Sequence, residues 1–322
     1  MTRLNTCVAF LLSPILGIQA QTAPSAQELL KISHAQADFS TFGPYKLTAN
    51  FLVTPLDKKG RPNAKKQQQG TLTVFRDDDR ARVEAQLGAD HETQFRIGNI
   101  RYLDPNGTLL AMLSLVNFDQ SWDPERPGDG QLRKQYTLSG PIRKKINDAE
   151  AWCLESEKKE LCFGVETSAL LKAEPYRFSD YRKTGDLQFP RQVEIERREM
   201  PPVEVADISV TTQALAPDTF RVPERMLAIE SCEDWRAAKP IFTPEPEFTD
   251  AARKHHAGGL VVLNLIIGMD GKVVGAQALT EDRYGLAQQA TIKVKTWRFE
   301  PAVCGGHPVS SAMEVEVGFG LY

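Results

Sequence analysis

The sequence lacks an excess of charge of one sign, and it lacks any hydrophobic run long enough to suggest a multi-span membrane protein. Its 322 residues carry 39 Lys and Arg against 42 Asp and Glu, which gives a formal net charge of −3. Without a basic excess the chain has little to hold a phosphate backbone, so nucleic acid is not an expected partner. The most apolar stretch, residues 260–267, has only the length of a strand.

Short catalytic signatures are missing as well. The sequence contains no Gly-x-Ser-x-Gly, no phosphate-binding Gly-rich loop and no dinucleotide fingerprint. It has no Cys-x-x-Cys pair, and its one Cys-x-x-His, at residues 304–307, is isolated, so a zinc site is not expected. Asp119, Asp123 and Asp129 alternate with prolines and glycines and predict a loop. We therefore expect no enzyme activity, no cofactor and no metal.

Residues 1–20 have the three parts of a secretory signal peptide. Arg3 supplies a positive start, residues 7–18 form an apolar run that contains Pro14, and Ala20 offers a small residue for cleavage. The run is shorter than the roughly 20 residues that a membrane anchor needs. We therefore expect export to the periplasm or cell envelope with cleavage of this segment. A retained anchor is the alternative.

Cleavage would leave an even number of cysteines. Of the five in the chain, Cys7 lies in the signal segment, and the other four suit an oxidising compartment. Three connectivities are possible for four cysteines. Cys153 and Cys162 lie symmetrically within one predicted hairpin, which would set them opposite each other at a separation that a disulfide accepts. The remaining pair would be Cys232 with Cys304.

Residues 25–230 change from one helix to a long series of strands. Helical spacing of apolar residues begins after Ser25, a plausible N-cap with Glu28 as its capping-box partner. After this helix, apolar and polar residues alternate with a period of two, apart from a second helix expected over residues 109–118. The strands are expected near residues 45–53, 70–75, 80–87, 92–103, 136–138, 151–154, 161–165, 176–183, 191–198 and 203–212. The pattern predicts an α+β fold with a large, curved antiparallel sheet and few helices.

Five prolines between residues 217 and 246 indicate a Pro-rich junction, which we place at residues 231–245. Beyond it the chain changes to a compact order of helix, strand, strand, helix and strand. These elements are expected near residues 248–256, 260–267, 273–279, 286–297 and 309–319. The sequence therefore predicts a second, small domain at residues 246–322.

Nine residues of this small domain follow one another in a familiar order. They are Gly259, Asp270, Gly271, Trp297, Phe299, Pro301, Gly306, Pro308 and Phe319. In this order and spacing, residues 246–322 resemble the TonB C-terminal domain family. The resemblance implies an interaction module of the bacterial envelope, and it raises the alternative of a TonB-type energy transducer for outer-membrane transport with a retained N-terminal anchor.

Residues 25–230 resemble, more distantly, the LolA-like lipoprotein-carrier group of half-barrels. The likeness rests on the opening helix, the long curved series of strands and the aromatic run at residues 176–181. It implies a periplasmic carrier that holds a lipid or another apolar ligand against residues such as Phe51, Val74, Phe95 and Leu113. The competing interpretation is that these side chains fill an ordinary core.

The last predicted strand is the candidate partner site. Glu314 and Glu316 alternate with its apolar residues, and such charges discourage random pairing at a sheet edge while allowing a chosen partner. We expect this edge to bind an envelope or outer-membrane protein, or a second copy of the chain, by strand addition. An internal strand is the alternative. The residues concerned are Ser310, Met313, Val315, Val317 and Phe319.

Overall fold

The structure is a computed structural model that describes residues 23–57, 59–124, 138–156 and 160–320. The predicted signal peptide at residues 1–20 lies outside the described residues, as does Asp129. Among the described helices, none combines the length and the apolar character needed to cross a membrane.

One helix and one very large sheet make up most of the N-terminal part, which we define as residues 23–230. Helix α1 (Ala26–Ala37) begins at the predicted capping box, in which Ser25 Oγ accepts from Glu28 N at 3.2 Å and the Glu28 carboxylate accepts from Ser25 N at 2.7 Å. Its buried side packs against strand β11 (Leu187–Ile195). The prediction of an opening amphipathic helix is confirmed.

The sheet contains 13 antiparallel strands in the order β13-β5-β4-β3-β2-β1-β12-β11-β10-β9-β8-β7-β6. Strands β1 to β5 are neighbours in chain order, and so are strands β6 to β12, as expected for hairpin connections. The non-consecutive neighbours are β12 with β1 and β13 with β5. The predicted α+β class with a large antiparallel sheet and few helices is confirmed. The strands are β1 (Tyr45–Val53), β2 (Gln68–Asp77), β3 (Arg80–Leu87), β4 (Asp90–Ile97), β5 (Ile100–Leu103), β6 (Ser139–Ile146), β7 (Ala149–Glu155), β8 (Glu160–Gly164), β9 (Leu170–Ala173), β10 (Tyr176–Thr184), β11 (Leu187–Ile195), β12 (Val203–Thr212) and β13 (Leu227–Glu230).

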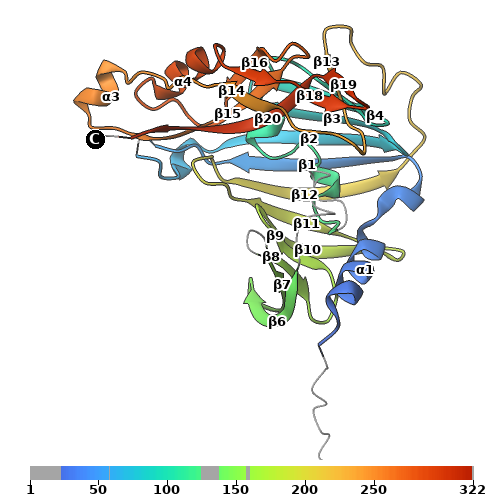
Figure 1. Cartoon of the computed structure of the whole chain (residues 1–322). Coiled ribbons are helices and arrows are strands. Elements are labelled where there is room, and N and C mark those ends of the chain that lie inside the picture. Colours follow the sequence, from blue (N-terminus) through green and yellow to red (C-terminus); the bar gives the residue numbers. More distant parts are fainter. Residues whose placement is uncertain (1–22, 58, 125–137, 157–159, 321–322) are drawn as a thin grey trace, which may run out of the picture.

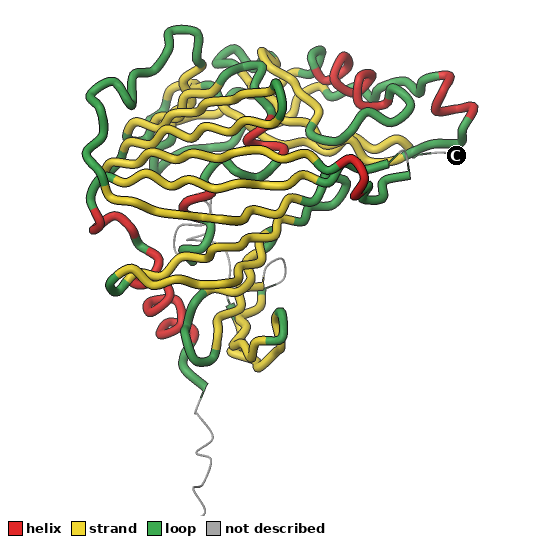
Figure 2. The backbone as a smooth tube through the Cα atoms, turned by 180° about the vertical axis from the view of Figure 1, so that it is seen from behind, coloured by secondary structure: helices red, strands yellow, loops and turns green. Residues whose placement is uncertain are grey.

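Only one face of the sheet is covered over most of its area. Figure 1 shows α1 and the C-terminal elements on that face, and Figure 2, the view from behind, shows the strands of the other face in front. The covered face holds the main core, whose largest fully buried side chains include Trp122, Phe51, Phe118, Phe163 and Phe178. Alternate residues of β1 are buried, as the period of two predicted.

The expected helix over residues 109–118 is wrong in its length. Helix α2 spans only Leu109–Met112, and Ser114 follows it with φ at 57°, a left-handed conformation that ends an α-helix. A single 3-10 turn, η3 (Phe118–Gln120), comes next. Two further 3-10 turns, η1 (Phe39–Phe42) and η2 (Ala64–Lys66), lie near β1.

The C-terminal module, which we define as residues 246–320, has the predicted element order with three short strands added. Its main sheet runs β16-β15-β20, and Figure 1 shows α4 on the side of this sheet away from the large sheet. The elements are α3 (Asp250–Lys254), β15 (Gly259–Ile267), β16 (Val273–Ala278), α4 (Leu286–Val294), β17 (Arg298–Glu300), β18 (Ala302–Cys304), β19 (His307–Val309) and β20 (Ser311–Phe319). Strand β14 (Lys239–Phe242), within the predicted junction, pairs with β17.

Strand β15 is buried on both faces and belongs to two cores. Leu263 and Leu265 pack into the core of the module with α4. On the other face, Val262 packs against Met200 of the N-terminal part, and Ile266 forms a small cluster with side chains of β5 and β13. Burial on both faces explains why residues 260–267 read as a continuous apolar run rather than an alternating one.

Candidate functional site

Strand β20 lies at an edge of the module sheet. It pairs with β15 over nine residue pairs, from Phe319 opposite Gly259 to Ser311 opposite Ile267, and no described strand pairs with its other side. Among the described residues the last strand thus lies at a sheet edge, and its use as a partner site stays a prediction. Four of the five predicted edge residues lie in it, and Ser310 immediately precedes it.

The pairing pattern shows which backbone groups face the open side. Leu279 N donates to Val262 O at 2.8 Å, so the backbone of Val262 faces β16 and that of its neighbour Leu263 faces β20. Val315, which lies opposite Leu263, therefore bonds to β15. By alternation, the N–H and C=O groups of Glu314, Glu316 and Gly318 point to the open side of β20.

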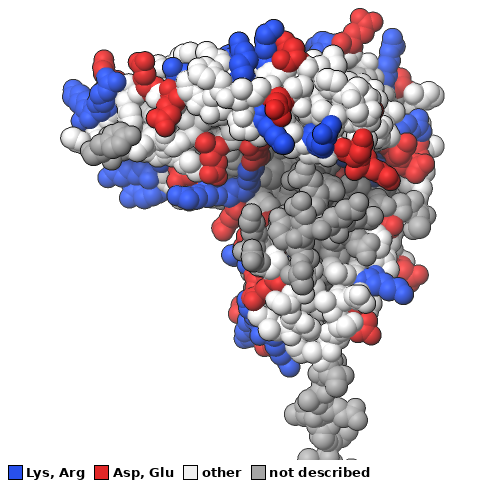
Figure 3. Space-filling view, in the orientation of Figure 1, with Lys and Arg blue, Asp and Glu red and all other residues white. Residues whose placement is uncertain are grey.

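A cleft of about 600 Å³ lies beneath this strand, between the module and the N-terminal part. Glu314 and Glu316 line it on the module side, and Val262 and Met200 form part of its apolar floor. Figure 3 shows acidic and basic side chains gathered at the inner corner below the overhanging end of the module. The other charged residues of the lining are Lys172, Glu174, Arg177, Glu196, Arg197 and Arg198.

Polar contacts fix the module on the N-terminal part, and one of them lies at this cleft. Arg197 donates to Glu314 across it. Arg283 Nη2 donates to Glu199 Oε2 at 2.6 Å, and Leu56 N donates to a carboxylate oxygen of Glu281 at 2.8 Å. The edge of β20 is therefore held in a defined position relative to the large sheet.

The turn between β15 and β16 explains why the family pattern needs Asp270 and Gly271. Asp270 Oδ1 accepts from Lys272 N at 3.1 Å, and Gly271 has φ at 75°. Gly271 O accepts from Phe299 N at 2.9 Å, and a Cβ at residue 271 would lie 1.9 Å from Phe299 O. Only glycine fits this close approach of the turn to β17.

The other motif residues support the two ends of the module. Trp297 Nε1 donates to Pro244 O at 3.1 Å, and the ring of Phe319 meets that of Phe248 edge to face at 5.5 Å. Gly259 opens β15, and Pro301 separates β17 from β18. Gly306 has φ at 82° in the turn between β18 and β19, and Pro308 lies in β19 opposite Val303.

The sequence comparison agrees with this placement of the motif. Residues 244–321 match the Gram-negative bacterial TonB protein C-terminal family. The C-terminal module is thus a TonB C-terminal-type module, and the match covers all of it.

Comparison with solved structures finds, among others, the crystal structure of a DUF1329 family protein from Desulfovibrio piger. The TM-score is 0.39 and the sequence identity 8%, over 60% of this chain and 95% of that chain. A superposition this loose supports no argument about fold or function. Among curated proteins no match was found.

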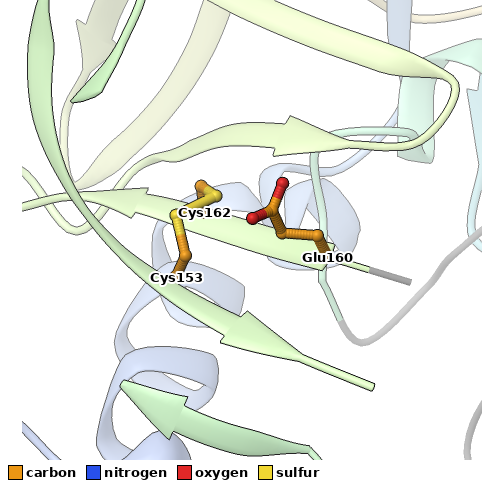
Figure 4. Close-up of side chains that lie close together, drawn as sticks. All are labelled: Cys153, Glu160 and Cys162. Atoms are coloured by element: carbon orange, nitrogen blue, oxygen red, sulfur yellow. A yellow bond between two sulfur atoms is a disulfide. The ribbon is translucent and has the colours of Figure 1, made fainter. Parts of the chain in front are cut away.

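Both predicted disulfides are present. Cys153 and Cys162 lie directly opposite each other on β7 and β8, with Cα atoms 4.1 Å apart (Figure 4). Cys232 and Cys304, with Cα atoms 5.8 Å apart, join the segment after β13 to β18 of the TonB-type module. The carboxylates of Glu160 and Asp234 lie near these cysteines, but sulfurs bonded to each other offer no thiolate to a metal ion.

A buried ion pair lies where the sequence predicted only a loop. Asp119, in η3, has an exposed fraction of 2%. Its carboxylate accepts from Tyr45 Oη at 2.8 Å and from Arg76 Nη2 at 3.0 Å. Burial alone would raise the pKa of Asp119, but the charge of Arg76 together with the hydrogen bonds from Arg76 and Tyr45 lowers it on balance. The sequence of β2 could have indicated a buried arginine, because Arg76 continues the alternation of the buried residues Leu72 and Val74.

Three of the four residues expected to hold an apolar ligand occupy a packed core. Phe51, Val74 and Leu113 are fully buried in the main cluster of the N-terminal part. Phe95 lies on a neighbouring strand beneath Arg82, whose guanidinium carbon is 5.7 Å from the ring centre. None of the four lines the cleft beside β20.

Proposed function

We propose that this is an exported, non-enzymatic envelope protein that binds an extended segment of an envelope or outer-membrane protein by strand addition to β20. The TonB-type module supports the envelope setting, and the two disulfides suit an oxidising compartment. The short apolar segment at the start of the chain supports export with cleavage.

The observation that carries this proposal is the set of open backbone groups at Glu314, Glu316 and Gly318. An added strand would form main-chain hydrogen bonds with these groups, which provide affinity with little dependence on partner sequence. Alternate side chains of that strand would point into the cleft, where the charged walls would select among partners. The acidic side chains of β20 protect the edge from non-specific pairing.

Site-specific photocrosslinking tests this proposal. We expect benzoylphenylalanine at position 316, in protein exported to a Gram-negative envelope, to give an adduct whose mass identifies either another envelope protein or a second copy of this chain. Gly318→Pro should lower the adduct yield by about tenfold or more, because proline removes an outward N–H and adds bulk at the open edge.

Gly318→Ala is the matched control. A Cβ at residue 318 meets nothing within 4 Å, and alanine keeps the N–H, so this variant should crosslink as the parent does. Equal melting temperatures of the two variants would show that proline acts at the edge rather than on folding. The proposal fails if no adduct forms at position 316, or if proline and alanine give the same yield.

A further inference from the structure

The loop between β1 and β2 concentrates positive charge. Residues 57–67 contain five basic side chains and one acidic one, and no further acidic residue occurs before Asp77. The whole chain has a net charge of −3, so this loop is opposite in sign to the chain that carries it. Lys59, Lys65 and Lys66 are exposed, and none of them forms an ion pair with a carboxylate of the described residues. Their charges are therefore available to a partner.

Hydrogen bonds hold this loop in a defined shape. The Asp57 carboxylate accepts from Lys59 N at 2.8 Å, from Arg61 N at 3.0 Å and from Arg61 Nη2 at 2.8 Å. The hydrogen bonds from the backbone and side chain of Arg61 lower the pKa of Asp57 to about 2, so this carboxylate stays charged and is already engaged. Asn63 N donates to Pro55 O at 2.8 Å and ties the loop to its base. The fold thus positions the backbone that carries the exposed lysines.

The loop lies at one end of the large sheet, where it contacts the C-terminal module. Figure 1 shows it at the left end of the sheet, below the module. Leu56 N donates to the Glu281 carboxylate, and a Cβ at residue 60 would lie 2.7 Å from Arg283 Nη1. Figure 3 shows basic side chains along the underside of this end of the molecule. The loop contributes no residue to the lining of the cleft beside β20.

The chemistry of this loop fits a spread of negative charge rather than a single small anion. An ammonium group is a compact, hydrated point charge on a flexible stem, and it lacks the paired donors of a guanidinium group. At an anionic bilayer each basic residue near the surface adds to the attraction, so exposed amines on one loop act together. The apolar residues among them, Pro62 and Ala64, are too small to anchor the chain in lipid. The attraction would therefore be electrostatic and sensitive to salt.

We propose that Lys59, Lys65 and Lys66, together with Arg61, form a basic surface that binds an anionic phospholipid bilayer. Contact through this surface would hold the end of the large sheet that carries the module close to a membrane. The proposal does not depend on strand addition to β20, because the two surfaces share no residue.

Sedimentation of the purified full-length protein with lipid vesicles tests this inference. The probes are phosphatidylcholine vesicles with and without phosphatidylglycerol. We expect binding to the vesicles that contain phosphatidylglycerol to be at least about tenfold tighter than binding to pure phosphatidylcholine. Sodium chloride at about 1 M, where the Debye length is about 3 Å, should release the protein.

The test variant is Lys59→Gln/Lys65→Gln/Lys66→Gln. It should lose affinity for anionic vesicles by about tenfold or more, since each lysine near such a surface contributes about fivefold. All three side chains are exposed, so the melting temperature should equal that of the parent.

The matched control is Lys145→Gln/Lys183→Gln/Lys239→Gln. It removes three exposed lysines from β6, β10 and β14 and changes the net charge by the same amount. Because these lysines lie apart from the basic surface in the sequence and in three different strands, this variant should bind anionic vesicles as the parent does.

The inference is overturned if the parent does not bind the anionic vesicles, if it binds pure phosphatidylcholine equally well, or if the two triple variants bind equally. Binding that persists at about 1 M salt would also contradict it, because a surface of exposed amines is screened there. Polyglutamate is the probe for an acidic protein segment. If the parent bound polyglutamate through the same three lysines but did not bind the vesicles, the surface would serve a protein partner and the proposal would be wrong.

Discussion

Replacing Cys232 and Cys304 together with alanine is expected to lower the free energy of unfolding by about 4 kcal/mol. The two cysteines are 72 residues apart in the sequence, so their bond removes much conformational entropy from the unfolded chain. On the chain-entropy model, this effect grows with the logarithm of the loop length. Urea denaturation of the oxidised protein, followed by circular dichroism, measures the change.

The second disulfide provides the comparison. Cys153 and Cys162 are only nine residues apart, and the same model gives about 2.6 kcal/mol for their loop. We expect the Cys232→Ala/Cys304→Ala variant to lose more stability than the Cys153→Ala/Cys162→Ala variant. Because both cysteines of the shorter bridge are fully buried, replacing them also changes the packing around them. Equal stability of the parent and the Cys232→Ala/Cys304→Ala variant would show that the long bridge does not constrain the unfolded chain.

Replacing Asp119 with asparagine is expected to cost about 3–5 kcal/mol at neutral pH. The substitution leaves the Arg76 guanidinium buried without its counter-charge, since the arginine side chain is only 9% exposed. Replacing both partners with apolar residues of similar size should cost less than Asp119→Asn alone, because no charge then remains to be buried. Denaturation of the parent and of the two variants in urea provides the measurement.

The pH dependence of stability provides a separate test of the ion pair between Asp119 and Arg76. The pKa of Asp119 is lower in the folded protein than in the unfolded chain, where it is about 3.9. Its contribution to stability is therefore complete above the unfolded pKa and is lost as the pH falls through the folded pKa. Asp119→Asn should flatten this acid-dependent loss. Glu150→Gln, which removes an exposed partner of Arg143, serves as control and should change stability by less than about 1 kcal/mol.

The large sheet was predictable because its strands have one face on the core and one face toward solvent. A period of two follows directly from that arrangement, and β1, β2 and β3 show it clearly. The first disulfide was predictable for a related reason, since cysteines symmetric about a hairpin turn lie opposite each other. For β20 the alternating charges favoured an edge position but left an internal strand as the alternative.

The packing of the two parts on each other was not predictable from local pattern. The run at residues 260–267 indicates a strand buried on both faces, but it does not say what covers the second face. The pairing of Arg76 with Asp119 joins residues 43 positions apart in the sequence. The end of α2 was missed because the left-handed conformation of Ser114 has no residue signature such as glycine.

Neighbouring residues of β15 serve different cores, since Val262 packs toward the large sheet and Leu263 toward α4. Opening the module alone would expose Val262, Ile266 and Met200 to water at the same time as it broke the pairing of β15. The two halves of the molecule are therefore coupled through one strand, and we expect them to unfold as a single cooperative unit. We therefore expect the amide protons of β15, which is paired on both sides, to be the most slowly exchanging of the module.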